Sequence, residues 1–359
     1  MIQRRQFLGS AATLFGAASL TKIASASDSS TNRAGLNWRC NVIQTVPQNK
    51  ARRCPVVTGV SLQNNGNLLA IVGDDHYVSL YDTTQRQFVE HLDGHTDWVR
   101  TAKFSPDGTK LATAGNDREL LIWRADRWKA PVVTKRHPEA IIDCAYSNNG
   151  QKLATVGFEQ TLRLYGTENG RLLQKFSCAC PDNHAVAFSK DDAYLAAGGR
   201  CGTIRVWDMS NNRSVAQFKA HKKRIRSIEF TSDGKVVSAG DDQVVRVTDP
   251  LRPNTSKSFP RHAAKLYSTA ILDGNLLAIG GSDNLIHVWN LNDFQEVGPL
   301  KGHTGTVSCL DYSTGKLVSG SYDTRVRLWH TEKHISTPIQ RETKLIGGAN
   351  RNGWNRRIK

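Results

Sequence analysis

Short runs of apolar residues separated by turn residues recur along most of this chain. The most regular copy lies between Gly302 and His330. After an opening Gly-His pair, an apolar run is followed by a Thr-Gly turn, a second short run, a turn containing Tyr322-Asp323, and an alternating run that ends in Trp329. Short β-rich runs bounded by turn residues are strand signals. The pattern therefore predicts a series of short strands.

Aligning this copy with the rest of the chain reveals seven copies with three positions in phase. The last position holds Tyr81, Trp123, Tyr165, Trp207, Thr248, Trp289 and Trp329. The position six residues earlier holds Asp75, Asp117, Glu159, Cys201, Asp242, Asp283 and Asp323. The opening position holds Arg53, His95, His137, Ala179, His221, His262 and His303. The copies are spaced by 40 to 42 residues, and a fixed period of this kind indicates a repeat architecture.

The residues Gly94-His95 with Trp123, Trp207-Asp208, and Gly302-His303 with Trp329 resemble the tryptophan-aspartate (WD) repeat of β-propellers. The resemblance implies an all-β fold, a seven-bladed propeller of four-stranded antiparallel blades. The Asp that gives the repeat its name follows Trp in full only at Trp207-Asp208.

The propeller is expected to span residues 37–334. In this family the first residues usually complete the last blade, and the segment from Trp38 to Val46 alternates as such a closing strand should. Closure protects strand edges that would otherwise pair with other chains. The segment from His334 to Gln340 competes for the same place, although Pro338 counts against it. Residues 335–359 form a basic C-terminal tail.

Residues 1–26 have the features of an export signal. Arg4-Arg5 precedes a short apolar region and Ala24-Ser25-Ala26, which matches an A-x-A cleavage site. The two arginines, followed by Gln-Phe-Leu, indicate the twin-arginine type; an ordinary secretion signal or an uncleaved anchor is the alternative. We expect a periplasmic or otherwise exported protein, with a flexible lead-in at residues 27–36 and no transmembrane segment in the mature chain. A cytoplasmic location is expected only if residues 1–26 are not an export signal.

The resemblance also implies a hydrogen-bonded tetrad in each regular blade, in which an imidazole donates to a carboxylate and accepts from a hydroxyl that meets an indole N–H. Two blades have all four residues, and these eight structural residues are His95, Thr113, Asp117, Trp123, His303, Ser319, Asp323 and Trp329. Blade six has Ile279 in place of the hydroxyl, and blade five has Thr248 in place of the Trp. His-Asp pairs that recur at these positions are expected to be scaffold.

In the fourth copy, Ala179 and Cys201 replace the His and the Asp of the tetrad, and Cys178 and Cys180 flank Ala179. We predict that Cys180, or else Cys178, bonds to Cys201 and substitutes for the lost hydrogen bond, as an oxidising compartment allows.

A second predicted bridge, between Cys40 and Cys54, would tie the closing strand to the first blade. The protein has seven cysteines. The two that fall in inner strands, Cys144 and Cys309, are expected to behave as small apolar side chains.

The formal net charge is +16, and removal of residues 1–26 takes away three basic residues and no acidic one, leaving +13. A basic exported domain attracts acidic partners such as acidic proteins or anionic envelope polymers. Nucleic acid is disfavoured by the export signal. The alternative is that the charge only keeps the protein in solution.

Propellers of this family commonly bind partners on the face that carries the loops leading into the inner strands. Its exposed positions lie three and five residues after the opening His and one residue before the turn acid. Carried onto this sequence, the partner-binding candidates are Trp98, Arg100, Phe158, His184, Arg200, Arg224, Arg226, Lys265, Tyr267 and Tyr322. Arg, Trp and Tyr are the usual hot-spot residues. The alternative is that Lys222, Lys223, Arg224 and Arg226 are a solvated charge cluster and that Trp98 packs on its neighbour.

No motif favours an enzyme, and no catalytic residue, cofactor or metal site is predicted. His330 and His334 are spaced like metal ligands, but that spacing requires a helix. The favoured function is a non-enzymatic scaffold for protein–protein interaction with an acidic or extended partner. A cell-wall or polysaccharide-binding propeller is the first alternative. A propeller hydrolase comes next and would be favoured by a cluster of acidic residues around the central channel.

Overall fold

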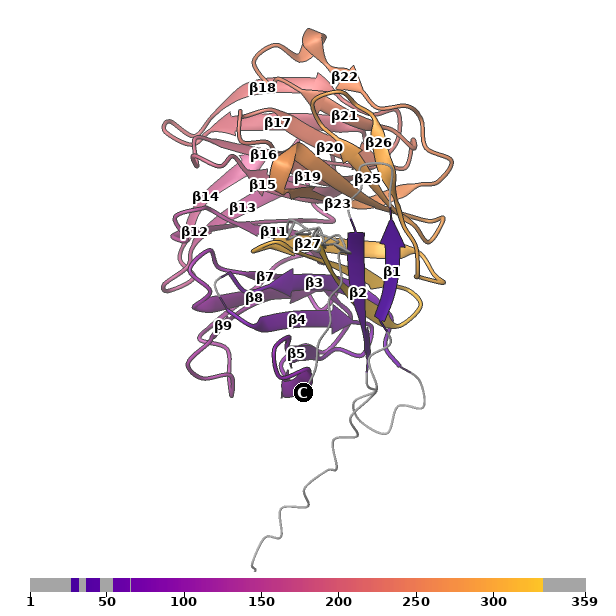
Figure 1. The fold of residues 1–359 in the computed structure, drawn as a ribbon. Coiled ribbons are helices and arrows are strands. Elements are labelled where there is room, and N and C mark those ends of the chain that lie inside the picture. The colour runs from indigo at the N-terminus through magenta and orange to yellow at the C-terminus, as the bar shows by residue number, and fades with distance from the viewer. Residues whose placement is uncertain (1–26, 32–36, 46–53, 65, 332–359) are drawn as a thin grey trace, which may run out of the picture.

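The computed structural model describes residues 27–31, 37–45, 54–64 and 66–331 and arranges them as seven antiparallel β-sheets in a ring (Figure 1). The all-β, seven-bladed prediction is confirmed. The helices within these residues are two single 3-10 turns, η1 (Pro253–Thr255) and η2 (Asp273–Asn275). None of the helices in this part of the chain is long and apolar enough to cross a membrane.

Each of the first six blades is formed by four strands that are consecutive in the sequence, beginning with the innermost strand. The blades are numbered in chain order. Blade 1 contains β3 (Val57–Leu62), β4 (Leu68–Gly73), β5 (Val78–Asp82) and β6 (Gln87–Leu92). Blade 2 contains β7 (Val99–Phe104), β8 (Lys110–Gly115), β9 (Glu119–Arg124) and β10 (Val133–Arg136). Blade 3 contains β11 (Ile141–Tyr146), β12 (Lys152–Gly157), β13 (Thr161–Gly166) and β14 (Leu172–Ser177).

The same order continues around the ring. Blade 4 contains β15 (Asn183–Phe188), β16 (Tyr194–Gly199), β17 (Thr203–Asp208) and β18 (Arg213–Lys219). Blade 5 contains β19 (Ile225–Phe230), β20 (Val236–Gly240), β21 (Val245–Thr248) and β22 (Lys257–Ser258). Blade 6 contains β23 (Leu266–Leu272), β24 (Leu276–Gly281), β25 (Ile286–Asn290) and β26 (Glu296–Leu300). Blade 7 contains β27 (Val307–Ser313), β28 (Lys316–Ser321), β29 (Arg325–Thr331), β2 (Asn37–Gln44) and β1 (Ser27–Thr31).

Burial falls from the middle of each blade to its outer edge. In β8 and β28 every residue after the first is buried, whereas β14 is exposed at five of its six positions. Apolar side chains from adjacent blades meet in shared clusters, for example Val78 and Leu80 of blade 1 with Trp123 of blade 2. Each inner strand contacts the next, and β27 contacts β3, so the core is continuous around the ring.

The N-terminal strand closes the ring, as predicted. β2 pairs antiparallel with β29, so that the two ends of the propeller lie side by side in Figure 1. Trp38, Cys40 and Ile43 of β2 are buried in the shared core. Blade 7 is therefore held together by the two ends of the chain.

The expected flexible lead-in differs from the structure over residues 27–31, which form β1 on the outer edge of β2. A polar sequence does not prevent an outer strand, because such a strand needs only a neighbouring row of backbone N–H and C=O groups. The export signal at 1–26, the rest of the lead-in, His334 to Gln340 and the tail at 335–359 lie outside the described residues.

Candidate functional site

One end of the ring is built from paired loops. In every blade, the residue that precedes the position of the turn acid donates its backbone N–H to the carbonyl of the residue three positions after the opening position. The N···O distances are 2.9–3.3 Å. The donor and acceptor pairs are Asp74–Val56, Asn116–Trp98, Phe158–Ala140, Arg200–Asp182, Asp241–Arg224, Ser282–Lys265 and Tyr322–Thr306. We call this end the loop face. It brings together the positions predicted to bind a partner.

A column of glycines permits these loops to approach so closely. A Cβ atom on Gly115 would lie 2.2 Å from the Trp98 carbonyl oxygen, and one on Gly199 would lie 1.9 Å from that of Asp182. Sequence reasoning missed this column, although its signal was present: glycine occupies the last position of the second strand in six of the seven blades. These glycines therefore set the geometry of the loop face.

The two complete tetrads are formed as predicted. In blade 2, His95 Nδ1 lies 2.7 Å from Asp117 Oδ2 and Nε2 lies 2.8 Å from Thr113 Oγ1, which accepts the Trp123 indole N–H at 3.0 Å. In blade 7 the corresponding distances are 2.9, 2.7 and 2.9 Å. All eight residues are buried or nearly so, and they tie the loop face to the blade core.

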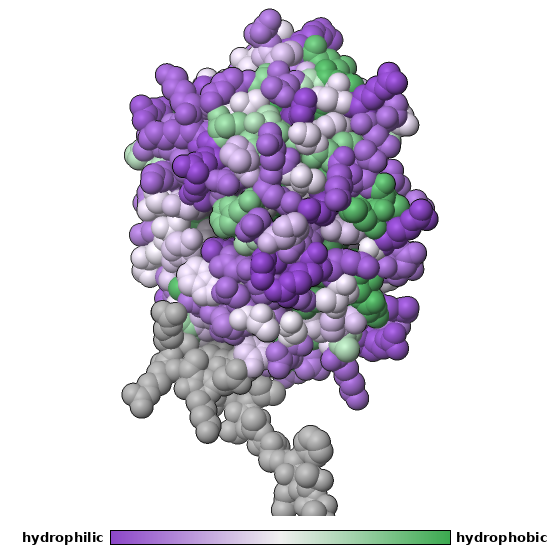
Figure 2. Space-filling view, turned by 180° about the vertical axis from the view of Figure 1, so that it is seen from behind, coloured by the Kyte–Doolittle hydropathy of each residue, from purple (hydrophilic) through white to green (hydrophobic). Residues whose placement is uncertain are grey.

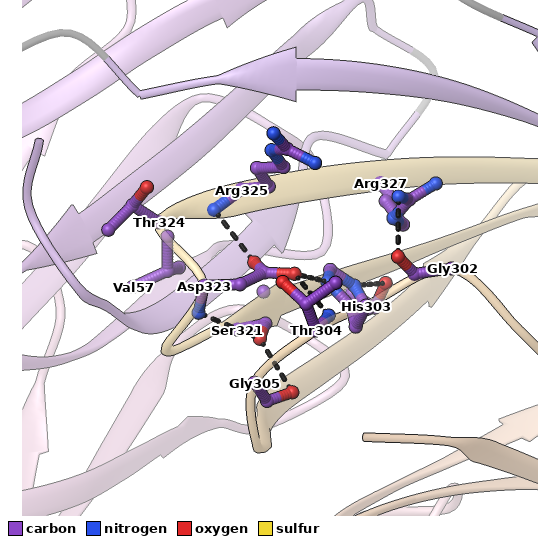
Figure 3. A network of polar contacts seen from close by, with 12 residues as sticks. Val57, Gly302, His303, Thr304, Gly305, Ser321, Asp323, Thr324, Arg325 and Arg327 are labelled. Carbon is purple, nitrogen blue, oxygen red and sulfur yellow. Dashed lines mark hydrogen bonds and ion pairs between the residues drawn. The ribbon is translucent and has the colours of Figure 1, made fainter.

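Figure 3 shows how the blade 7 carboxylate fixes the surrounding backbone. Asp323 accepts from the backbone N–H groups of Thr304 at 2.9 Å and Arg325 at 3.0 Å in addition to His303. Burial alone would raise the pKa of Asp323, but these hydrogen bonds and the neighbouring imidazole hold it below its usual value. A carboxylate saturated in this way is structural.

Two further blades form partial tetrads. In blade 5, His221 contacts Asp242 at 2.8 Å and Ser238 at 2.9 Å. Thr248, which stands in the position of the Trp, forms a hydrogen bond with Ser256 at 2.9 Å instead. In blade 3 the Tyr165 hydroxyl reaches His137 Nε2 directly, at 3.0 Å, and so replaces both hydroxyl and indole.

Blade 6 departs from the pattern in a way that the sequence analysis did not anticipate. Asp283 contacts His287 at 2.9 Å, and His287 also contacts Glu296 at 2.7 Å. The opening His262 only packs against the His287 and Trp289 rings, and its Nε2 is buried without a partner. Because Ile279 has no hydroxyl that could donate to the His262 ring, the usual tetrad does not form, and His287 on the third strand hydrogen-bonds to the carboxylate instead.

Blade 4 replaces its tetrad with a disulfide between Cys180 and Cys201, whose Cα atoms lie 5.5 Å apart. The preferred prediction is confirmed, and the alternative through Cys178 is not adopted, because Cys178 is buried in the core between blades 3 and 4. The bridge joins the same loop and turn that a His–Asp pair joins elsewhere.

The predicted bridge between Cys40 and Cys54 is wrong. Cys40 packs with Trp329 and with blade 6 residues, on one face of blade 7. Cys54 leads into blade 1, which packs against the opposite face, where Ile43 lies. Alternate residues of a strand point to opposite faces, so the Cys40 side chain points away from Cys54.

An arginine column on the third strand was also missed. Four blades carry Arg two residues before the repeat's last position: Arg163, Arg205, Arg246 and Arg327. Arg327 is 4% exposed, and its Nη2 donates to the Gly302 carbonyl at 2.7 Å, beside Trp329. Arg205, Arg246 and Arg327 each donate to a backbone carbonyl of the loop before the opening position, whereas Arg163 pairs with Glu159.

A cavity of about 480 Å³ runs along the propeller axis, between the inner strands. At the loop face its mouth is lined by five of the predicted partner-binding residues, Arg100, His184, Arg226, Tyr267 and Tyr322. The other five predicted residues stand around the mouth: Trp98, Phe158, Arg200 and Lys265 are exposed, and Arg224 is half-buried. The structure thus places the ten predicted residues on one face, with half of them at the opening of the channel.

The cations at the mouth are held by aromatic and polar neighbours. Arg100 stacks over the Trp98 ring at 4.9 Å and donates to Asn116 at 2.8 Å. Arg226 lies over the Tyr267 ring at 5.1 Å and forms a two-point ion pair with Asp241 at 2.9 and 3.2 Å. These contacts orient the two guanidinium groups at the channel.

Deeper in the channel, three carboxylates surround one lysine. Asp143 accepts the Val186 N–H at 3.1 Å, Glu229 accepts the Ile271 N–H at 3.1 Å, and Asp311 accepts the Leu62 N–H at 2.7 Å. In each case the donor belongs to the inner strand of the next blade. These acids therefore fasten neighbouring blades, and their arrangement favours a structural role over a hydrolytic one.

Lys103 supplies the opposite charge. Burial alone would lower its pKa, but the carboxylates of Asp311, Asp143 and Glu229 raise it. Burial raises the pKa of Asp143 to about 6. In the part of the chain that the structure covers, no group of three or more His, Cys, Asp or Glu side chains could hold a metal ion.

Figure 2 shows a surface that is largely hydrophilic, with small and separate hydrophobic areas. The exposed large apolar residues are likewise spread over several blades, among them Val89, Val215 and Leu251.

Comparison with known proteins identifies the repeat. The model of the WD domain, G-beta repeat, matches residues 86–124, 174–208, 212–249 and 294–330. Each matched range ends within two residues of the end of a blade's third strand, near the last recurring position of each copy in this chain.

Several known proteins are similar to this chain over part of its length. Human Apoptotic protease-activating factor 1 is 24% identical over 341 residues, which cover 80% of this chain and 26% of that protein. The WD repeat-containing protein 26 homolog of Drosophila melanogaster is 23% identical over 317 residues, or 72% of this chain and 50% of that protein. U3 small nucleolar RNA-associated protein 15 of Saccharomyces cerevisiae is 31% identical over 129 residues, 33% of this chain and 25% of that protein.

This chain thus spans a quarter to a half of the length of these relatives. The matched repeats, the tetrads and the closed ring agree on one identification. The chain is a seven-bladed β-propeller that contains WD40 repeats, four of which match the WD domain model.

Proposed function

We propose that this protein is an exported, non-enzymatic scaffold that holds an acidic or extended protein partner on its loop face. The observation that carries the proposal is the composition of that face. Among the paired positions that define this face, the three acids are already engaged: Asp74 accepts the Val56 N–H, Asp182 pairs with Arg200, and Asp241 pairs with Arg226. The charge that remains unpaired at the predicted partner-binding positions is positive.

Three cations on the face remain available to a partner. Arg100, Arg224 and Lys265 form no ion pair with any carboxylate among the described residues. Trp98, Phe158 and Tyr322 are 39%, 43% and 48% exposed beside them. Exposed aromatic rings interleaved with Arg are typical of protein interfaces.

The WD40 repeats support a scaffold over an enzyme, since propellers of this kind are generally interaction platforms. The repeat region is also what the chain shares with its larger relatives. The channel carboxylates would have favoured a hydrolase, but each is engaged by the backbone of the next blade. The second candidate is binding of an anionic envelope polymer, which the same unpaired cations would favour.

Export belongs to the proposal because it decides which partners are available. It rests on Arg4-Arg5, the short apolar region and Ala24-Ser25-Ala26. A reporter fused to residues 1–30 should be exported by the twin-arginine route and should stay in the cytoplasm when both arginines are changed to Lys. A reporter that remains cytoplasmic with the native sequence contradicts this part of the proposal.

Capture experiments test the scaffold. The full chain is used to pull down proteins from an envelope extract and is applied in parallel to a glycan array. The Trp98→Ala/Tyr322→Ala variant should lose the captured protein, because it removes two exposed rings of the loop face. Arg213→Ala, an exposed change on the outer strand β18, should retain it. Binding to glycans with no protein captured would favour the polymer-binding alternative.

A further inference from the structure

We propose that the loop face contains a carboxylate-binding subsite at the channel mouth between blades 4 and 5, where Arg224 holds the carboxylate and His184 takes up a proton as it binds. The carboxylate would come from an acidic side chain or from the C-terminus of the partner. The inference rests on the proposed function and gives it a specific ligand chemistry.

Two buried polar atoms in this place have no partner. His184 is 9% exposed and lines the channel cavity, and its Nε2 atom makes no hydrogen bond. The Nε atom of Arg224, on the adjacent loop into β19, is likewise buried and unpartnered. Leaving a buried polar group unpaired costs free energy. Two such groups in one place therefore indicate a missing acceptor.

The charges around the subsite select an anion. Arg226 is neutralised by Asp241, but Arg224 has no ion-pair partner in the described part of the chain. Arg100 stands in the same mouth on blade 2, also without a carboxylate. A carboxylate can accept from two donors at once, which suits an imidazole on which the charge of the Arg224 guanidinium already acts.

The proton coupling follows from what faces His184. The charged groups around the ring are Arg224 and Arg226 from blade 5, Asp241 from the turn of blade 5, and Asp182 from its own loop; Phe158 of blade 3 packs edge-on at 5.8 Å. Burial, and then the two arginines, lower the pKa of His184 to about 4. The free imidazole is therefore neutral above pH 5.

A carboxylate seated against the ring favours the imidazolium and raises the pKa of His184. If the complex restores an ordinary value near 6.5, binding takes up about 0.9 proton at pH 5.5 and is roughly tenfold tighter at pH 5.5 than at pH 7.5. The sign is opposite to that expected for a carboxylate held by arginine alone, whose binding weakens as pH falls toward the pKa of the carboxyl.

The test uses three acetylated Gly/Ser octapeptides as probes. One ends in a free carboxylate, one has a C-terminal amide and a single central Glu, and one has a C-terminal amide and no carboxylate. Isothermal titration calorimetry of the full chain, in two buffers of different ionisation enthalpy, measures affinity and proton uptake at pH 5.5 and 7.5. At least one carboxylate probe should bind with proton uptake, and the difference between the first two identifies the source of the carboxylate.

Two variants separate the roles of the residues. Arg224→Gln should weaken binding of the carboxylate probe by roughly tenfold or more at both pH values, because it removes a charged hydrogen bond. His184→Gln should retain binding at pH 7.5 but lose the proton uptake and the tightening at pH 5.5. Arg213→Gln, on the outer strand of blade 4, is the matched control and should change neither. Thermal unfolding of each variant verifies that it folds.

The proposal is overturned if the carboxylate probes bind no better than the probe without a carboxylate, or if His184→Gln leaves the proton uptake intact. Partner capture distinguishes this failure from that of the scaffold. Capture that depends on Trp98 and Tyr322 but not on Arg224 contradicts the subsite and preserves the scaffold. Capture that is indifferent to all loop-face residues contradicts both.

Discussion

Asp323 shows how one side chain can hold an end of a blade. It accepts from an imidazole and two backbone N–H groups, while Tyr322 beside it is 48% exposed and makes no comparable set of bonds. These two adjacent residues thus have different roles: Asp323 stabilises the fold, and Tyr322 contributes to the exposed surface. The repeat pattern makes this division readable from the sequence, because a position that recurs in phase is part of the scaffold.

Replacing Asp323 with Ala should lower the free energy of unfolding by about 3 kcal/mol, because it strands buried donors. Trp329→Ala should cost about 3–5 kcal/mol through the cavity it leaves. Tyr322→Ala should stay within about 0.5 kcal/mol of the wild type, as a surface change does. Urea denaturation followed by Trp fluorescence measures all three. Equal losses at Tyr322 and Asp323 would contradict this division.

Two buried histidines should make the fold sensitive to mild acid. Burial lowers the pKa of both His184 and His262 to about 4, so the unfolded chain binds more protons between about pH 4 and 6.5. Stability therefore rises with pH across this window and is lost as pH falls, by about 2–3 kcal/mol for each histidine. His262→Gln should reduce that loss, measured as the free energy of unfolding at pH 7 and pH 4.5. An unchanged pH dependence would contradict the assignment.

The sequence predicts the place of His262 but not its contacts. His262 belongs to the column of opening histidines, but Asp283 bonds to His287 instead, and that exchange depends on the missing hydroxyl at Ile279 and on how His287 packs against His262 in the folded blade. The arginine of the third strand escaped notice for a similar reason. Its role depends on a carbonyl in a loop more than twenty residues away in sequence, as in the pair of Arg327 with Gly302.

At the scale of elements, β2 decides whether the ring is closed. It contributes Trp38, Cys40 and Ile43 to the core and covers the edge of β29. Its alternating pattern made it predictable. β1 was not predictable, because residues 27–31 are polar and their pairing requires only backbone groups. The Cys40–Cys54 prediction failed since it ignored that Cys40 lies on the face of β2 that points away from blade 1.

Truncation tests the closing strand. Removing residues 1–36 deletes β1 and leaves β2, and the protein should unfold within a few degrees of the wild type. Removing residues 1–44 also deletes β2; burial of its three core side chains is worth about 5–8 kcal/mol, so Tm should fall by at least about 10 °C. The exposed edge should also promote aggregation. Differential scanning calorimetry and light scattering distinguish the two truncations, and similar behaviour would show that β2 does not close the ring.

The disulfide of blade 4 gives a second prediction at this scale. It closes a loop with a sequence separation of 21, and its loss through Cys180→Ser/Cys201→Ser should cost about 3 kcal/mol. A reductant should destabilise the wild type to the same degree and leave the double variant unaffected. Thiol titration of the denatured, oxidised protein should find two of the seven cysteines unreactive. Reaction of all seven would contradict the bridge.

At the scale of the whole molecule, the ring converts seven weakly similar copies into one surface. Each copy supplies three positions to the loop face, and the variation among copies places cations and aromatic rings around a channel whose deeper wall carries fixed carboxylates. The repeat period predicted the seven copies, and the resemblance to the WD repeat implied the blades, the ring and the residues of this face. The sequence could not predict which of these residues reach the channel mouth or which cations remain without an acid, because both depend on neighbouring blades.

Site-specific photo-cross-linking in living cells tests the central claim most directly. A photoreactive phenylalanine analogue replaces Trp98 or Tyr322 on the loop face, and Val215 or Leu251 at exposed positions elsewhere on the propeller. We predict that the two loop-face positions cross-link to the same protein and that the other two do not. Cross-links only from Val215 or Leu251, or none from the loop face, would contradict a partner-binding role for this face.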